Sequence, residues 1–213
     1  ITGYEKINII DPIRERTQST LTKTQKLFHF LQRAIASKGY YEAITWSFTD
    51  QKIEELLDEN KDSITILNPI SNELNVLRKS IFSNLLLYLK KNHDRGFQDI
   101  ALFEVGPIFY GKKPGEQKVV IGAVKSGQLN KKSWSEKTRN VDIFDVKTDV
   151  IKTLNEMGIK EENLFISDNS KSCYHPGRSG SINLKTINGP LLAQFGEIHP
   201  SVISKLDFKE KNI

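Results

Sequence analysis

The stretch DIALFEVGPIFYGKKPGEQKVVIGAVKSG, residues 99–127, decides the fold class of this 213-residue chain. Its apolar runs are interrupted by glycine and proline, which is typical of strands joined by tight turns. We expect several antiparallel strands here, with turns at the Gly106–Pro107 step and at KKPGE, residues 112–116.

Two amphipathic helices are predicted ahead of this stretch. The first covers residues 22–38, and its apolar positions recur at helical spacing: Leu27, Phe28, Leu31, Ala34 and Ile35. Gly39 follows it, where a left-handed C-terminal cap favours glycine. The second covers residues 80–94 and ends in a basic tail, Lys90 and Lys91. Its apolar side is formed by Ile81, Phe82, Leu85, Leu86 and Leu89.

Further strands are expected on both sides of the opening stretch. In YEAITWSF, residues 41–48, apolar Ile44, Trp46 and Phe48 alternate with Thr45 and Ser47. ITIL, residues 64–67, is a second short strand. A polar and basic loop at 128–140 and a helix over roughly 145–157 come next. The remaining strands are NLFIS, SINL and LLAQFGEI, with turns at HPGRSG and INGP and a short helix after Pro200. Helices packed on a largely antiparallel sheet make this an α+β protein.

The composition indicates a soluble globular protein, because 38% of the residues are hydrophobic and 27% are charged. The longest apolar run, LLLYL, is far shorter than the roughly 20 residues that span a bilayer. One cysteine and four scattered histidines give neither a disulfide nor a zinc site, so we expect the cytoplasm and no membrane. The net charge of +5 is weak evidence for a nucleic-acid partner. Because the chain begins with Ile1, we expect a fragment of a longer protein.

The segment CYHPGRSGSINL, residues 173–184, gathers groups that occur in active sites. Cys173 and His175 could share one face of a strand as a nucleophilic pair, but no nearby Asn or Asp would orient the imidazole. The alternative is a strand that ends in a turn, with Arg178 as a surface or ion-pairing residue. These residues leave two interpretations: a small-molecule enzyme that uses His175 and Arg178, or a structural turn.

Two other segments carry candidate sites. NKKSWSEKTR, residues 130–139, combines basic residues with an aromatic side chain, so it could contact RNA through Lys131, Lys132, Trp134 and Arg139. The alternative is a solvated loop whose tryptophan docks on its own domain. GEIHPSVISKL places Glu197 and His199 just before a proline at a helix start, and this pair alone is not a metal site.

Seven phrases follow one another along the chain: ITGYEKI, KGYYEAITWSF, ILNPISNELNVLRKSIFSNLL, IALFEVGPIF, IFDVKTDV, YHPGRSGSI and FGEIHPSV. In this order they resemble the beta subunit of bacterial-type phenylalanyl-tRNA synthetase. The resemblance implies a module with the antiparallel sheet and flanking helices of class II synthetases but without their active site. It also implies that residues 1–20 lead in from a preceding DNA-binding-like domain, and that residues 21–213 form the module, truncated at its C-terminus.

The same resemblance implies the partners. In this family a catalytic alpha subunit joins phenylalanine to tRNA-Phe with ATP and magnesium, and two alpha and two beta subunits form a heterotetramer. The module would pack on alpha and hold no cofactor itself. YHPGRSGSI would then be structural or interfacial. A tRNA-contacting basic module remains the alternative, with an independent enzyme behind it.

The residues allow a check on the missing chemistry. If Glu104 is matched to the acidic residue of the second class II motif, the arginine that holds the α-phosphate is replaced by Leu102. The loop after it, VGPI, is too short to reach over ATP, and the final arginine-bearing motif is absent from the sequence. AITWSF corresponds to the interface strand of the first motif but lacks its usual proline. We therefore expect no catalytic, cofactor or metal residues. The structural or interface candidates are Arg78, Glu104, His175, Arg178, Glu197 and His199.

Overall fold

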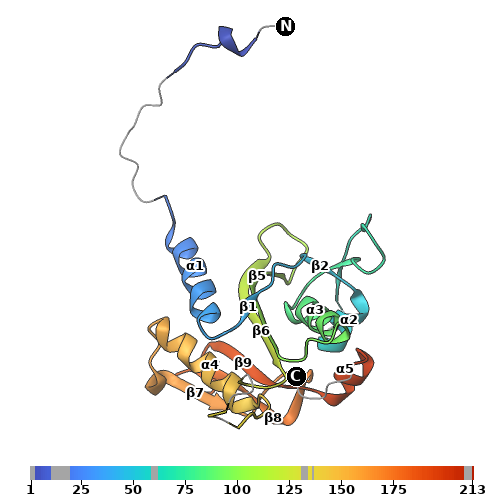
Figure 1. The fold of residues 1–213 in the computed structure, drawn as a ribbon, viewed down its shortest axis with the longest axis vertical. Coiled ribbons are helices and arrows are strands. Elements are labelled where there is room, and N and C mark those ends of the chain that lie inside the picture. Colours follow the sequence, from blue (N-terminus) through green and yellow to red (C-terminus); the bar gives the residue numbers. More distant parts are fainter. Residues whose placement is uncertain (1–2, 11–19, 59–61, 131–133, 136, 209–212) are drawn as a thin grey trace.

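The opening stretch folds as one long hairpin in the computed structural model, which describes residues 3–10, 20–58, 62–130, 134–135, 137–208 and 213. Strands β5 (Ile100–Phe109) and β6 (Gln117–Ser126) pair antiparallel over ten residues each (Figure 1). The predicted turn at residues 112–116 is confirmed. The predicted turn at Gly106–Pro107 is wrong, because both residues lie inside β5, opposite Val120 and Val119.

Pro107 fits inside this strand because of where it lies in the sheet. The other neighbour of β5 is β1 (Tyr41–Glu42), which runs parallel to it and pairs only with Leu102 and Phe103. At Pro107 this edge of β5 pairs with no strand and is bonded only by Arg78, so a missing N–H breaks no ladder bond. Strands β2 (Phe48–Thr49), β4 (Val76–Leu77) and β3 (Ile64–Thr65) form a second, small antiparallel sheet in that order.

The predicted strand over residues 41–48 is only partly correct. Its two ends are strands β1 and β2, but they belong to different sheets, and residues 43–47 cross between them. The α+β class is confirmed at the level of mixed helices and mainly antiparallel strands. The strands do not form one antiparallel sheet, however, because they divide into three sheets and β1 is parallel to β5.

The third sheet has the order β7 (Leu164–Ser167), β8 (Tyr174–Leu184), β9 (Leu191–Ile198), all antiparallel. The predicted turn at HPGRSG is wrong, because these residues lie within β8, where the register shifts between Tyr174 and Ser179. Gly180 serves close packing instead: a Cβ there would lie 2.8 Å from the carbonyl oxygen of Ser167 and 3.0 Å from the Phe195 ring. The turn at INGP is confirmed, since it joins β8 to β9.

The helices that the sequence predicts begin and end close to their predicted positions, and one further helix, over residues 51–57, was not predicted. Helix α1 (Lys23–Ala36) starts with a capping box between Thr22 and Gln25, and Gly39 after it has the expected positive φ of 88°. Asp142 caps α4 (Ile143–Glu156), which therefore begins two residues before the prediction. The other helices are α2 (Gln51–Leu57), α3 (Phe82–Asp94), α5 (Pro200–Lys205) and the 3-10 turns η1 (Tyr4–Lys6) and η2 (Glu161–Asn163).

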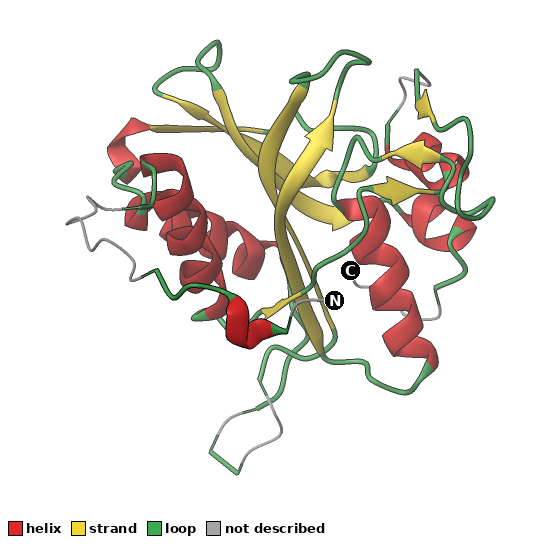
Figure 2. Ribbon diagram, turned by 90° about the horizontal axis from the view of Figure 1, so that it is seen from above, coloured by secondary structure: helices red, strands yellow, loops and turns green. Residues whose placement is uncertain are grey.

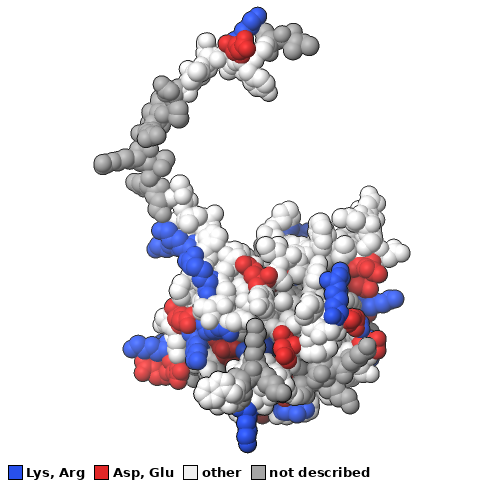
Figure 3. All heavy atoms as spheres, viewed as in Figure 1, with Lys and Arg blue, Asp and Glu red and all other residues white. Residues whose placement is uncertain are grey.

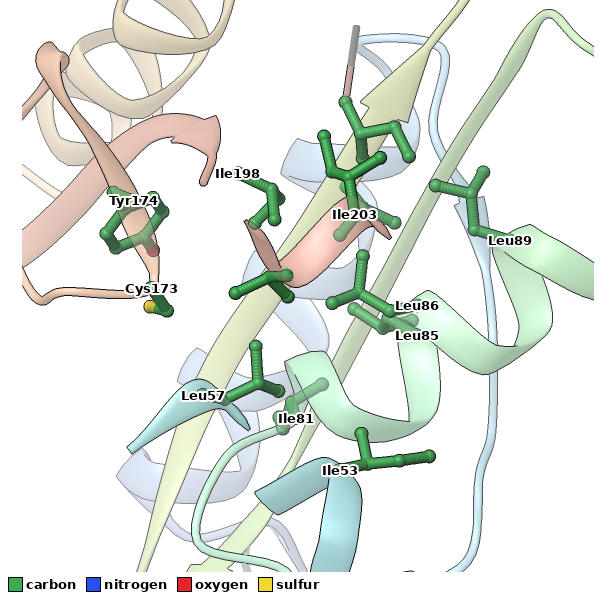
Figure 4. Packing of buried hydrophobic residues seen from close by; sticks show 13 residues of the cluster. Ile53, Leu57, Ile81, Leu85, Leu86, Leu89, Cys173, Tyr174, Ile198 and Ile203 are labelled. Atoms are coloured by element: carbon green, nitrogen blue, oxygen red, sulfur yellow. The ribbon is translucent and has the colours of Figure 1, made fainter. Parts of the chain in front are cut away.

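The hairpin lies between two helices. Helix α3 packs on one face through its predicted apolar side, together with α2 and α5 (Figure 4). Helix α1 packs on the other face, where Ile35 meets the buried side chains of Phe103 and Val105. Helix α4 covers the third sheet through Leu154, which contacts Ile182 and Phe195. The lead-in residues 3–10 lie away from this body (Figure 1), and the domain boundary at residue 20 stays a prediction.

An apolar cavity of about 550 Å³ lies between parts of the hairpin and of the third sheet and is lined by α1, β6, α4 and β9. A polar cluster at its rim joins the residue before β1 to β6 and α4. The Tyr40 hydroxyl donates to Asp149 at 2.8 Å, and Lys125 lies 3.4 Å from the same carboxylate. Burial and the Asp149 charge raise the pKa of Tyr40, so its hydroxyl stays protonated and keeps donating.

Gly122 sets the distance between α3 and β6. A Cβ at this position would lie 2.9 Å from Ile81 Cγ2 and 3.5 Å from Leu85 Cδ1. We expect Gly122→Ala to destabilise the protein by about 1–3 kcal/mol, because an overpacked core must shift. Urea denaturation would measure this, with Gly177→Ala as the control, since a Cβ there meets only His175 atoms at 3.8–3.9 Å. Equal stability of both variants would show that α3 is free to move.

Glu54, in helix α2, is a buried carboxyl group, 2% exposed, that faces the segment before α3. Its Oε2 accepts the Lys79 amide at 3.2 Å, while desolvation raises its pKa above the ordinary 4.5. A raised pKa in the folded state means that Glu54 contributes stability below the unfolded pKa and loses it as the pH rises through the folded pKa. We therefore expect Glu54→Gln to lose less stability than the wild type as the pH rises from about 4.5 to 7, in urea titrations at each pH. Parallel curves for the two proteins would contradict this.

Candidate functional site: a buried ion pair and the segment it holds

Arg78 and Glu104 form an ion pair in the interior. Arg78 follows β4 and is 1% exposed, and Glu104 lies in β5 and is 5% exposed. The Arg78 Nη1 and Glu104 Oε1 atoms are 2.8 Å apart. Two charges this deep are stable only if hydrogen bonds replace the water that they have lost.

The neighbouring groups supply those hydrogen bonds. Arg78 Nη1 also donates to Thr45 Oγ1 at 2.8 Å, and its Nε donates to the Pro107 carbonyl at 2.9 Å. The Thr45 hydroxyl in turn donates to Glu104 Oε2 at 2.6 Å. Both carboxylate oxygens are therefore bonded, and the ring of three side chains closes on itself.

Gly106 makes room for this network. A Cβ at this position would lie 2.5 Å from Arg78 Nη2 and 3.0 Å from Glu104 Oε1. Any larger residue would therefore push into the ion pair. Gly106 is thus a packing requirement of Arg78, which explains a glycine in the middle of a strand.

The network holds residues 43–47 with a polar side chain facing the interior and apolar side chains facing solvent, the reverse of the usual arrangement. Thr45 faces the ion pair, whereas Ile44 and Trp46 are 89% and 58% exposed. The Ala43 amide donates to the Phe103 carbonyl at 2.7 Å, and Asn84 Nδ2 donates to the Trp46 carbonyl at 2.6 Å. The alternation predicted for this segment is present, but its apolar side chains point into solvent and its threonine points inward.

Other large apolar side chains are exposed at the same end of the molecule. Leu67 and Ile70, in the connection from β3 to β4, are 98% and 75% exposed, and Tyr110 in the hairpin turn is also exposed. In Figure 1 these segments all lie at the upper end of the body, and Figure 3 shows few charged side chains there. An exposed apolar surface with few charged side chains is typical of a protein contact.

The residues around 173–184 do not form a nucleophilic site. Cys173 is 4% exposed, and burial raises the pKa of its thiol, which keeps it neutral and unreactive. His175 Nδ1 accepts the Gly177 amide at 3.1 Å within the same strand. Arg178 Nε lies 3.0 Å from Glu197 Oε2 across β8 and β9. His199 caps α5 by accepting the Ser201 amide on Nδ1.

The four candidate RNA contacts differ in what the structure shows of them. Lys131 and Lys132 lie outside the described residues. Trp134 is 99% exposed, so the alternative in which it docks on its own domain is wrong. Arg139 pairs with Asp145 through both guanidinium nitrogens, at 2.7 and 2.6 Å.

The two parts of β5 that were compared with the second class II motif, Leu102 and VGPI, belong to the packed hairpin. Leu102, which the sequence analysis matched to the position of the missing arginine, is partly buried and packs at the edge of the main core. VGPI is not a loop but part of β5, and the connection between the two strands is formed by residues 110–116, which corrects the prediction. Within the described ranges, no cluster of three or more His, Cys, Asp or Glu side chains could hold a metal ion, and no helix is long and apolar enough to cross a membrane.

Comparison with known proteins identifies the family. The model of the phenylalanyl-tRNA synthetase beta chain CLM domain matches residues 7–213. The chain belongs to this family. Its relatives include the phenylalanine–tRNA ligase beta subunits of Rhodospirillum rubrum, 36% identical over 90% of this chain, and of Rickettsia bellii, 38% identical over 99% of it. The chain spans about a quarter of their length, 24% in both cases.

A similar fold occurs in a solved structure, the pyrrolysyl-tRNA synthetase of Desulfitobacterium hafniense. The match has a TM-score of 0.63 and covers 88% of this chain and 61% of that one. At 13% identity it shows the fold alone. The CLM domain thus shares its mixed arrangement of helices and antiparallel strands with this pyrrolysyl-tRNA synthetase.

Sequence reasoning missed two members of the buried network. Thr45 was interpreted only as one of the polar residues that alternate along a strand, and Gly106 was assigned to a turn. A signal existed in each case: a threonine between two large apolar residues, and a glycine two positions after a buried glutamate on the same strand face. Asp145, the partner of Arg139, was also missed, although it lies only six residues away.

We expect Arg78→Met in the CLM domain to lower the free energy of unfolding by about 3–5 kcal/mol, because Glu104 remains buried without its partner. The double variant Arg78→Met/Glu104→Gln should recover part of this loss. Arg178→Met is the matched control, because its pair with Glu197 is half exposed and contributes about 1 kcal/mol or less. Similar losses in Arg78→Met and Arg178→Met, measured by urea denaturation, would show that burial of the pair is unimportant.

Proposed function

We propose that the chain is a non-catalytic structural module of the phenylalanyl-tRNA synthetase beta subunit, with a class II synthetase-like fold, and that it packs on the catalytic alpha subunit. Its role in this proposal is to present a rigid surface. The alpha subunit would carry the chemistry, joining phenylalanine to tRNA-Phe with ATP and magnesium in the cytoplasm. Two alpha and two beta subunits would form the heterotetramer.

The reversed segment 43–47 carries this proposal. In a chain that works alone, an extended segment buries its apolar side chains and exposes its polar ones. Here Thr45 is drawn inward by Arg78 and Glu104, and the apolar neighbours Ile44 and Trp46 face solvent. Aromatic anchors held by a stiff scaffold contribute much of the binding energy in protein interfaces.

The buried ion pair supports the non-catalytic part of the proposal. Both oxygens of Glu104 are occupied by Arg78 and Thr45, so this carboxylate has no free position for a nucleotide or an amino acid. Leu102 offers no charge to a phosphate, whereas class II chemistry places an arginine there. The rival proposal of an enzyme at His175 and Arg178 has less support, because the two side chains bond to Gly177 and Glu197.

We expect the chain to form a complex with its alpha subunit in sedimentation velocity experiments, and Trp46→Asp to weaken it. The loss of a central aromatic anchor corresponds to about 2 kcal/mol, or roughly thirtyfold in Kd. Ile187→Ser is the control, because this exposed side chain lies in the turn between β8 and β9, outside the apolar end.

The possible results distinguish an error in the proposed interface residues from an error in the proposed partner. Loss of binding in both variants would indicate a general defect, which circular dichroism of each variant would detect. Unchanged binding in Trp46→Asp would remove segment 43–47 from the interface. If neither this chain nor the full-length beta subunit binds alpha, the scaffold proposal is wrong.

A further inference from the structure

The long hairpin has an open edge along β6. In its sheet β6 pairs with β5 alone, and within the described residues no strand lies on its other side. The bonds of β5 show which of its backbone groups point away from β6. The Phe103 carbonyl accepts the Ala43 amide, and the Phe109 amide donates to the Arg78 carbonyl, so both residues direct their hydrogen-bonding groups away from β6.

The same register identifies the outward backbone groups of β6. Phe103 lies opposite Ala123, and Phe109 lies opposite Gln117. In an antiparallel pair, two residues that lie opposite each other both direct their N–H and C=O groups inward or both direct them outward. The outward positions of β6 are therefore Gln117, Val119, Ile121 and Ala123.

Strand β9 has a second open edge. It pairs with β8 alone in the third sheet. The Ile198 amide donates to the carbonyl of Ile213 at 2.8 Å, so Ile198 directs its amide away from β8, and alternation places Gly196 and Gln194 on the same edge. Ile213 is 9% exposed, and its backbone is bonded to β9 as a neighbouring strand would be.

Both edges border the apolar cavity. The cavity is lined by residues 119–121 and 123–125 of β6 and by residues 192–196 and 198 of β9. Successive residues of a strand point to opposite faces of the sheet, so a strand that faced the cavity with one side would line it with alternate residues. Consecutive residues indicate that the edges of β6 and β9 face the cavity. Figure 2 shows the strands of the body with helices on both sides of them.

The remaining walls of the cavity are apolar on both faces of the hairpin. Helices α1 and α4 contribute Phe28 and Val150, and the face that carries α3 contributes Phe82 and Tyr174, whose rings lie edge to face. A segment between β6 and β9 would be covered on both sides. Strands buried on both faces are apolar along most of their length.

We propose that this cleft binds one further β-strand, an extended and mainly apolar segment of the beta subunit that pairs with β6 on one side and with β9 on the other. Such a strand satisfies both rows of backbone groups and joins the hairpin to the third sheet. A segment that starts beside Ile213 runs along β9 from Ile198 toward Leu191, antiparallel to it. This inference goes beyond the scaffold function, because it requires no contact with alpha.

Other occupants fit the cleft less well. A small apolar ligand would contact the walls but leave the N–H and C=O groups of both edges without partners, which is costly next to apolar side chains. A second copy of the chain that paired with β6 would leave β9 open. The Rickettsia bellii beta subunit has further polypeptide that can supply a strand, since this chain spans 24% of its length.

Amide hydrogen exchange tests the proposal. The probe is a peptide of about ten residues from the Rickettsia bellii beta subunit, copied from the residues that follow the one aligned with Ile213. We expect it to slow exchange at Val119, Ile121 and Ala123 of β6 and at Gly196 of β9, because these amides become hydrogen-bonded. The same peptide with proline at alternate positions is the control, because it cannot pair as a strand.

A proline variant tests the pairing with β6. Ile121→Pro removes one outward N–H and leaves the ladder to β5 intact, in the way that Pro107 does on β5. We expect the affinity for the peptide to fall about fivefold, the effect of one lost hydrogen bond. Ile121→Val keeps the N–H and is the matched control. The melting temperature of each variant without peptide shows whether it folds.

The full-length beta subunit provides a second test that needs no peptide. The same β6 and β9 amides should exchange more slowly in it than in this chain alone. Slower exchange in either experiment supports the proposal, and unchanged exchange in both overturns it. It is also overturned if only the alpha subunit slows exchange at these amides, or if Ile121→Pro binds the peptide as tightly as Ile121→Val. None of these results depends on whether segment 43–47 binds alpha.

Discussion

The buried pair of Arg78 and Glu104 is the constraint on which the rest of this CLM domain depends. Removing two charges from water is costly, and the cost is offset only where every donor and acceptor finds a partner. Three segments supply the partners: the end of β4, the crossing segment 43–47 and β5. The same requirement fixes Gly106, orients Thr45 inward and leaves Ile44 outside. One interaction therefore occupies both carboxylate oxygens of Glu104 and shapes a surface that a protein could cover.

Patterns that depend on neighbouring residues predicted the fold well. The helices at residues 22–38 and 80–94, the hairpin turn at 112–116 and the turn at INGP follow from local spacing and turn chemistry, and all were found. The errors share a cause, since Gly106 and Gly180 were interpreted as turn residues but serve close approach inside strands. A glycine has both uses, and only the partner that lies against it, Arg78 or Phe195, distinguishes them.

The site was less predictable than the fold because its contacts are distant in sequence. Arg78 and Glu104 were both candidates, but nothing local shows that they meet across 26 positions. The orientation of Thr45 depends on both of them. The alternation of apolar and polar residues was therefore predictable, but not which of the two sets faces the interior. Arg139 shows the reverse case: its partner Asp145 is near in sequence, but the basic composition of the loop drew attention away from it. A run of basic residues does not show a free positive charge when an acidic partner, here Asp145, lies in the first turn of the following helix.

Gly106 has a consequence for how the domain can change. A side chain at position 106 and the long guanidinium at position 78 compete for the same space, so neither position can vary alone. A shorter residue at position 78 would free that space but leave Glu104 unpaired. Position 104 therefore depends on positions 78 and 106. These three positions, two in β5 and one just after β4, therefore behave as a single inherited unit. Within the family, substitutions at them should occur together or not at all, and an isolated change would mark a relative that has lost this arrangement.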